Sequence, residues 1–292
     1  MKIRLDNSAF STLSCRRKFQ LTVIDGLHGC ESAPLTTGNA YHKWIEHYML
    51  TGDFQQALAH VAQSYPTFDL GKHAAGFKHL ELTTKFPAPL ILNGQPAIEL
   101  KFSYPYGSFF SERDGEKVDV ELQGTIDLVY LDGDTLVLRD YKTAADAKDA
   151  SMQSKMMEYE LSFQLPFYTY ALLKSDILPE DIRNKILDHK YRTEYFYIFY
   201  NTAPPTTKVR MKGAFPDAFL HEEVPLIINQ KVSDAIKVAQ LKNTAAAHDG
   251  MCVYKACSYC NFQPACLAMG TQKEQDFLDR FERREYNPLT FR

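Results

Sequence analysis

Residues 124–143 read GTIDLVYLDGDTLVLRDYKT, and this stretch predicts a β-hairpin at the centre of the fold. Two runs rich in valine, leucine and threonine flank Asp132 and Gly133. An Asp-Gly pair between two such runs is a strong hairpin signal, because both residues tolerate the backbone angles of a tight turn. We therefore predict two antiparallel strands joined at this point.

The hairpin brings two carboxylates and one ammonium group together. Alternate residues of a strand share a face, so Asp140 and Lys142 point the same way. A turn at 132–133 leaves Asp127 diagonal to Asp140, whereas a turn at 133–134 pairs the two directly. The companions on this face are apolar: Val129, Leu131, Leu136 and Leu138. Two interpretations are open here, a catalytic site that is costly to bury and a solvated ladder of ion pairs on an exposed strand.

The catalytic interpretation has a specific chemistry. Hard cations such as magnesium or manganese bind carboxylate oxygens. Such an ion can bind a phosphate oxygen, lower the pKa of a bound water and steady the leaving oxygen. The lysine can hold or deprotonate the attacking water, or offset charge in the transition state.

Helical and alternating patterns surround the hairpin. The stretch AIELKFSY at 97–104 and residues 191–200 alternate as strands, with Glu99 opposite the apolar face of the first. Helical spacing predicts helices at 39–50, 54–64, 72–85, 160–175 and 226–247. Because central strands are flanked by helices, we predict an α/β layered fold.

Six cysteines form a second pattern: Cys15, Cys30, Cys252, Cys257, Cys260 and Cys266. The last three lie in KACSYCNFQPAC as C-x2-C-x5-C, which presents several sulfurs to one centre. A closed site needs a fourth ligand, for which Cys15, Cys30 and Cys252 are the candidates. The spacing alone fits zinc, an iron–sulfur cluster or thiols without a metal.

The composition of the chain limits which kinds of partner it can bind. The chain has 292 residues and a formal net charge of −3, and its 45% of hydrophobic residues exclude a mostly disordered chain. A nucleic acid would therefore meet a local basic patch. The run Arg16, Arg17 and Lys18 is a candidate for phosphate contacts, and a merely solvated run is the open alternative. No apolar run reaches the roughly 18–20 residues of a membrane span, and no secretory signal begins the chain, so we expect a cytoplasmic protein without a membrane partner.

The motifs together resemble those of a known family. Gly124, Asp127 and the run Asp140-Tyr141-Lys142-Thr143 resemble the PD-(D/E)XK nuclease superfamily, and more narrowly its RecB-like exonuclease branch. Gly38 and His42 resemble the upstream glycine–histidine motif of that branch, and Gln164 and Tyr168 its Q-x3-Y helix. The chain departs in having no proline before Asp127, and it carries no G-x4-G-K-[ST] motif of a helicase motor.

The cysteines resemble those of the iron–sulfur members of that branch, which include the AddB nuclease domain and CRISPR-associated adaptation nucleases. The resemblance implies a structural 4Fe–4S cluster held by Cys15, Cys257, Cys260 and Cys266. Cys30 and Cys252 are then not ligands.

The resemblance also implies a fold and a site. The fold is a restriction-endonuclease-like core with a central mixed sheet flanked by helices, in a single nuclease domain over 1–292. Its parts are an N-terminal segment 1–37, a core 38–225 and a C-terminal helix with the cluster-binding loop 226–292. The implied metal ligands are His42, Glu99, Asp127 and Asp140, and the implied catalytic residues are Asp127, Asp140, Lys142, Gln164 and Tyr168. The competing interpretations are a structural histidine at 42, a solvated acid at 99 and ordinary packing for Tyr168.

The implied function is a magnesium- or manganese-dependent DNA exonuclease acting on single strands or duplex ends. Its protein partners would belong to a repair, phage or CRISPR pathway. Two alternatives remain. One is a catalytically weak DNA-end-binding or assembly module that keeps the fold, and the other is a structural protein held by zinc.

Overall fold

A computed structural model describes residues 2–29, 33–145, 149–201, 205–241, 257 and 260–283. The chain forms two compact units. The terminal unit combines Met1–Cys30, Ser103–Gly124 and His221–Arg292, and the central unit combines Glu31–Phe102 and Thr125–Leu220. Sequence division at residues 37 and 225 remains a prediction of domain organisation. The structure adds that residues 103–124 belong with the terminal segments.

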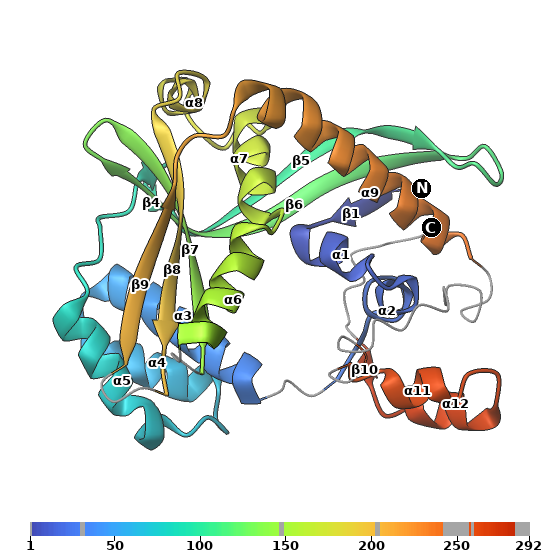
Figure 1. The fold of residues 1–292 in the computed structure, drawn as a ribbon, viewed down its shortest axis with the longest axis horizontal. Helices are drawn as coiled ribbons and strands as arrows, with labels where there is room; N and C mark the ends of the chain where they lie inside the picture. Colours follow the sequence, from blue (N-terminus) through green and yellow to red (C-terminus); the bar gives the residue numbers. More distant parts are fainter. Residues whose placement is uncertain are drawn as a thin grey trace. The chain divides into compact units, whose positions relative to one another are not determined.

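The central unit holds most of the regular structure (Figure 1). Its helices are α3 (Ala33–Thr51), α4 (Phe54–Ser64), α5 (Leu70–Thr83), α6 (Asp149–Glu160), α7 (Gln164–Lys174) and α8 (Glu180–Leu187). Its strands are β3 (Ile91–Leu92), β4 (Gln95–Pro96), β7 (Thr135–Ala144), β8 (Tyr191–Phe199) and β9 (Thr206–Lys212). Two long strands, β5 (Ile98–Phe110) and β6 (Lys117–Asp132), begin in one unit and end in the other.

The sheet is mixed, with strand order β1-β6-β7-β8-β9 and β5 also paired with β6. The predicted hairpin is confirmed as β6 and β7, which run antiparallel. Asp132 pairs with Thr135, so the turn residues are Gly133 and Asp134 and the alternative turn at 132–133 is wrong. Gly133 has φ +59°, the left-handed region that glycine adopts without strain. β7 then pairs in parallel with β8, whose outer neighbour β9 is antiparallel.

Helices cover both faces of the central sheet (Figure 1), and each face buries its own core. Helices α3, α4 and α5 pack on one face through a cluster that includes Tyr41, Trp44, Phe77, Tyr141 and Phe196. The opposite face packs against α6 and α7 through Met156, Leu165, Tyr195, Tyr197 and Phe199. Successive residues of β7 alternate between these cores, so Tyr141 faces α3 while Asp140 and Lys142 face α7.

The terminal unit joins the two ends of the described chain. Its elements are β1 (Lys2–Leu5), α1 (Asn7–Thr12), α2 (Arg16–Phe19), the π-helical turn η1 (Gln20–Ile24), β2 (Leu27–His28), α9 (Val224–Ala239), α11 (Gln263–Leu267), α12 (Gln272–Leu278) and β10 (Glu282–Arg283). A second π-helical turn, η2 (Phe219–Glu223), begins in the central unit and ends in the terminal one. β1 lies parallel to the first half of β6, and β2 pairs with β10. Leu21 and Leu27 pack with Phe262 in a small core that Cys260 and Cys266 also contact.

The helix predicted at 39–50 begins earlier, at Ala33, and that predicted at 72–85 is observed as Leu70–Thr83. Two further helices need correction. The helix predicted at 160–175 is two helices, because α6 ends at Glu160 and α7 begins at Gln164. Pro166 therefore lies in the first turn of α7, where its missing N–H costs no hydrogen bond. The helix predicted at 226–247 is observed as Val224–Ala239, and its last residues lie outside the described part of the chain, as do Cys30 and Cys252.

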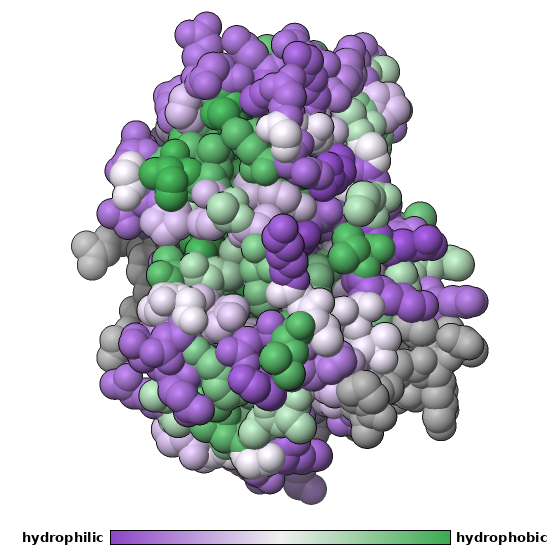
Figure 2. Space-filling view, turned by 90° about the vertical axis from the view of Figure 1, so that its left-hand side faces the viewer, coloured by the Kyte–Doolittle hydropathy of each residue, from purple (hydrophilic) through white to green (hydrophobic). Residues whose placement is uncertain are grey.

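The surface mixes residue types. Figure 2 shows hydrophilic residues interspersed with apolar patches over one face of the molecule. Among exposed apolar side chains are Met211 of β9 and Leu161 after α6. In the part of the chain that the structure describes, no helix combines the length and apolar character needed to cross a membrane.

Candidate active site

The first component of the site is the close approach of α3 to β7. A Cβ atom at Gly38 would lie 2.7 Å from Thr143 Oγ1, a distance that real Cβ atoms essentially never show. Glycine therefore lets the helix approach the strand directly after Lys142. His42 lies four residues later, on the same side of the helix. The glycine–histidine spacing thus has a physical reason. Gly38 allows α3 to contact β7, and this contact brings the His42 side chain close to the strand.

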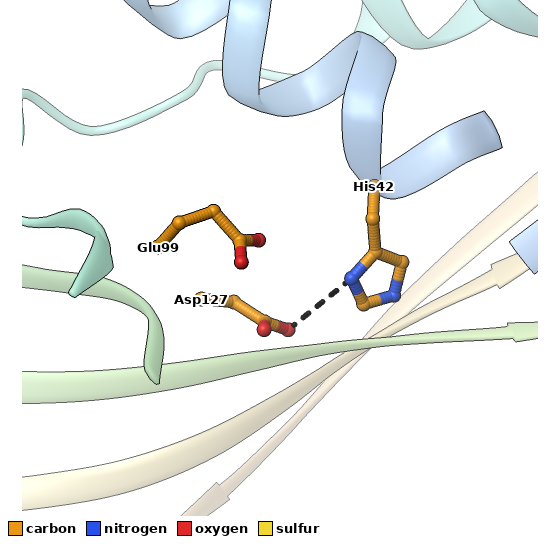
Figure 3. Close-up of side chains that lie close together, drawn as sticks. All are labelled: His42, Glu99 and Asp127. Atoms are coloured by element: carbon orange, nitrogen blue, oxygen red, sulfur yellow. Dashed lines mark ion pairs between the residues drawn. The ribbon is translucent and has the colours of Figure 1, made fainter. Parts of the chain in front are cut away.

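Glu99 enters from the start of β5 with an unusual backbone. Its φ is +49°, in the left-handed region that a glutamate rarely occupies. Such a conformation costs of the order of 1–3 kcal/mol and persists only where the surrounding structure imposes it. The alternation predicted for 97–104 is interrupted here, while Phe102 and Tyr104 are buried and Lys101 and Ser103 are exposed as expected. The departure aims the carboxylate of Glu99 at His42 and Asp127 (Figure 3).

Asp127 lies where β6 and β7 stop pairing. The recorded ladder ends at Leu128 and Arg139. Beyond this point, the backbone N–H of Tyr141 on β7 donates a hydrogen bond of 2.7 Å to Asp127 Oδ2 on β6. The acid thus takes a hydrogen bond that a strand backbone would otherwise make, and its position is fixed by the sheet itself.

Three of the predicted ligands converge. One ligand atom each from His42, Glu99 and Asp127 lie within 4.8 Å of one another, and no other such set of three occurs among the described residues (Figure 3). His42 Nδ1 lies 3.6 Å from Asp127 Oδ2. One imidazole nitrogen and two carboxylate oxygens at this spacing fit a divalent cation, and the imidazole favours manganese over magnesium.

Asp140, the fourth predicted ligand, belongs to an adjoining network. Its Oδ2 lies 2.6 Å from Lys142 Nζ, and its Oδ1 accepts a hydrogen bond of 2.7 Å from Gln164 Nε2. Gln164 Oε1 accepts in turn from Lys142 Nζ at 2.9 Å. Gln164 Nε2 also donates to Tyr168 Oη at 3.1 Å. The glutamine therefore holds the acid and the lysine in one arrangement, with Tyr168 supporting it from the next helical turn.

The site accumulates acids whose ionisation is opposed. Burial, opposed by Lys142, raises the pKa of Asp127 to about 6, and burial with the nearby Asp127 raises that of Asp140 to about 6. Burial and the Asp127 charge raise the pKa of Glu99 to about 7. Burial lowers the pKa of His42, so its imidazole is neutral and available as a ligand. Three acids with raised pKa values lie close together, and a bound cation would stabilise their charged forms.

The lysine keeps its charge. Burial favours a lower pKa for Lys142, but Asp140 and Asp127 outweigh it and the pKa is raised. Its ammonium also lies 5.0 Å from the ring centre of Tyr159, a cation–π distance. Tyr159 was missed by sequence reasoning. Tyr159 lies in α6, and the spacing of residues in the sequence does not show that α6 contacts β7.

The cysteines lie in the terminal unit. The four that the structure describes are half-buried and form no disulfide. Cys15 caps α2, since its Sγ accepts from Lys18 N at 3.4 Å. A zinc ion with Zn–S bonds of about 2.3 Å would hold its thiolates about 3.8 Å apart. Among the described residues no three cysteines meet even the wider limit of 4.8 Å. The thiols therefore lack the spacing of a single-zinc site.

The basic run after Cys15 is not a continuous phosphate track. Arg16 and Lys18 are exposed, whereas the side chain of Arg17 is fully buried and pairs with Glu274. Arg17 therefore fits neither interpretation of the run, since a buried side chain is neither solvated nor able to contact a phosphate. The four-residue helix α2 turns the middle side chain inward, which a charge count cannot reveal.

Comparison with known proteins identifies a family. A family model described as the PD-(D/E)XK nuclease superfamily matches residues 8–267. A search of curated proteins finds no match. Among solved structures, one titled "Crystal structure of SSO0001" matches with 12% identity and a TM-score of 0.30, over 87% of this chain and 92% of that chain. That likeness is too weak to support an argument, so the family model carries the assignment.

Proposed function

This chain belongs to the PD-(D/E)XK nuclease superfamily, which indicates nuclease activity, and on that premise we propose that it is a metal-dependent DNA exonuclease. We place its substrate as single-stranded DNA or duplex ends, in line with the RecB-like motifs of the sequence. The observation that carries the proposal is the convergence of His42, Glu99 and Asp127 beside the Asp140–Lys142 pair.

In this proposal each side chain has a separate task. His42, Glu99 and Asp127 hold a magnesium or manganese ion, with Asp140 as a further ligand from the adjoining strand. A bound ion would polarise the phosphate and lower the pKa of a bound water. Hydrolysis would then form one bond from the water oxygen to phosphorus and break the bond from phosphorus to the leaving sugar oxygen, while the attacking water gives a proton to solvent and the leaving oxygen takes one up.

Lys142 serves as a fixed positive charge. Because its pKa is raised, the Lys142 ammonium is protonated at neutral pH, and we assign it no role as a base. Its ammonium offsets the negative charge that develops on the phosphate. Gln164 positions Lys142 and Asp140 through two hydrogen bonds, and Tyr168 positions Gln164. These two residues are therefore expected to act through the lysine and the acid.

We further propose that Cys15, Cys257, Cys260 and Cys266 hold a structural 4Fe–4S cluster. A cluster binds each thiolate to a different iron and so spaces the sulfurs more widely than one zinc ion does. The packing of Leu21 and Leu27 against Phe262, Cys260 and Cys266 supports it, because this packing brings the N-terminal and C-terminal segments together. By the loop-entropy argument used for disulfides, a link between distant Cys15 and Cys257 would contribute roughly 5 kcal/mol of stability.

End-labelled DNA tests the nuclease proposal. The anaerobically purified protein is incubated with linear single-stranded DNA, linear duplex and circular single-stranded DNA, with manganese, magnesium or chelator. We expect metal-dependent loss of both linear substrates from their ends and an intact circle. Cleavage of the circle would replace the exonuclease proposal with an endonuclease. Metal-independent binding without cleavage of any substrate would instead support the DNA-end-binding alternative.

A further inference from the structure

Arg17 is a buried cation with unused hydrogen-bond donors. Its side chain is 0% exposed, and its Nη2 pairs with Glu274 of α12. Its Nε and Nη1 atoms are buried as well, and neither has a hydrogen-bond partner among the residues that the structure describes. Those two nitrogens carry three of the five N–H groups of a guanidinium. Buried N–H groups are nearly always satisfied, so an orphaned set on one charged side chain points to an absent acceptor.

The position of Arg17 limits which chemical groups can be that acceptor. Arg17 follows Cys15 by two residues on α2. Its partner Glu274 belongs to α12, and Leu278 of the same helix packs into the small core with Cys260 and Cys266. The guanidinium therefore joins the helix that follows Cys15 to the helix that follows the other three cysteines.

The charges around Arg17 leave room for an anion. Glu274 also accepts a hydrogen bond of 2.8 Å from Gly270 N, so its charge is shared. Asp25 lies near enough for Arg17 and Arg283 to lower its pKa, yet burial prevails and the pKa is raised. A side chain with no exposed surface cannot reach a nucleic-acid backbone, so a phosphate of DNA is excluded as the acceptor.

We infer that Arg17 donates hydrogen bonds to the inorganic sulfides of the iron–sulfur cluster and offsets its negative charge. The inference rests on the proposed cluster and assigns it an electrostatic partner. Four thiolates give such a cluster a net negative charge, and hydrogen bonds to sulfur and nearby charges set its reduction potential. Arg17 stabilises the reduced form, which carries one electron more, and raises the potential.

The test compares charge-removing variants of the cluster-loaded protein. Arg17→Gln is purified without oxygen beside Arg16→Gln, which removes the same charge from an exposed neighbour. Iron and sulfide content, the reduction potential by redox titration and the rate of cluster bleaching by a chelator are measured for each. We expect Arg17→Gln to show a more negative potential and roughly 10- to 100-fold faster bleaching. Arg16→Gln should match the wild type in both.

A second variant covers the case in which Arg17→Gln does not fold. Glu274→Gln removes the anion that competes for the guanidinium, so its cluster should have a more positive potential than the wild type. Equal potentials and bleaching rates in the wild type and in all folded variants would overturn the inference while leaving the cluster in place. A wild-type protein with zinc or no metal at the cysteines would overturn the cluster proposal and the inference together.

Discussion

Two buried ion pairs lie on consecutive residues of β7 and face opposite cores. Arg139 Nε lies 2.5 Å from Glu194 Oε1, which also accepts a hydrogen bond of 2.7 Å from Tyr130 Oη. On the other face, Asp140 pairs with Lys142 at 2.6 Å. The strand, the depth and the pair chemistry are alike, so the difference between the two pairs lies in their neighbours.

The Arg139 pair is electrostatically closed. Its guanidinium lies 5.1 Å from the ring centre of Tyr130 and 5.2 Å from that of Phe196. Glu194 Oε2 also lies 3.7 Å from Nε of Arg192, whose Nη2 pairs with Asp132 at 2.8 Å. The Asp140 pair instead adjoins Asp127 and Glu99, whose pKa values are raised. In the first network each carboxylate faces a guanidinium, whereas the second has an excess of acids that a cation would balance. The comparison teaches that burial of an ion pair alone does not mark a site.

The largest expected effect is on catalysis. Asp140→Asn keeps the shape of the side chain but removes a proposed ligand and the partner of Lys142. We expect DNA hydrolysis to fall by about a thousandfold or more, because several kcal/mol of charge stabilisation depend on the ion. Single-turnover rates on end-labelled DNA measure the loss. Undiminished cleavage would show that the open network is not the catalytic one.

Lys142→Ala should separate catalysis from binding. The ammonium is proposed to act at the reacting phosphate, so the rate should fall roughly 10²- to 10³-fold while most DNA affinity remains. Rates at saturating DNA and binding by fluorescence anisotropy give the two quantities. Large loss of binding with a normal single-turnover rate would contradict the role assigned to the lysine.

Glu194→Gln should break the closed network and spare the chemistry. Removing one partner of a buried pair leaves Arg139 uncompensated, which costs roughly 3–5 kcal/mol of unfolding free energy. Urea denaturation measures the loss, and the activity of the folded fraction should stay near that of the wild type. The double variant Arg139→Met, Glu194→Met removes both charges and should recover much of the stability. A catalytic defect in the folded Glu194→Gln protein would contradict the division between the networks.

Gly38→Ala should disturb the approach of α3 to β7. The added Cβ must displace Thr143, which costs about 1–3 kcal/mol of stability as overpacking does and moves His42. Melting temperature and the apparent affinity for manganese in the nuclease assay report the two effects. Gly71→Ala in α5 is the matched control, because its Cβ would meet only ordinary contacts. Thr143→Ala in the Gly38→Ala background should restore both properties if the contact is the cause.

The smallest effect is on the pH dependence of the metal-free protein. Acids whose folded pKa values are raised bind more protons in the folded state than in the unfolded state between about pH 4 and 7. The unfolding free energy should therefore fall as the pH rises through this range. Added manganese should stabilise the protein little at pH 5 and increasingly above pH 7. Melting temperatures with chelator and with metal test this, and Asp127→Asn should flatten the metal-free dependence.

The sequence predicted the hairpin because its information is local. Alternation and the Asp-Gly turn placed Asp127 and Asp140 on one face, although two turn registers remained and only the sheet chose between them. The spacing of Gln164 and Tyr168 predicted a shared helix face, and the hydrogen bond between their side chains agrees with it. Roles for these residues remain predictions, because geometry alone does not measure a rate.

Other features depend on long-range packing and left no local pattern. The burial of Arg17 depends on α12, more than two hundred residues later in the chain. The contact of Tyr159 with Lys142 depends on how α6 crosses β7. The union of residues 103–124 with both termini arises from tertiary pairing, since β1 lies beside β6. A single sequence gives residue types and periods, and these contacts require the three-dimensional fold.

The left-handed backbone of Glu99 has a consequence for selection. Glycine or asparagine would relieve the strain at φ +49°, and either would also remove an acid with a raised pKa from a crowded site. A library randomised at position 99 and selected only for folded protein should therefore drift toward these two residues. The same library selected for DNA hydrolysis should return glutamate or aspartate. The identity of residue 99 thus records which of the two demands the chain has had to meet.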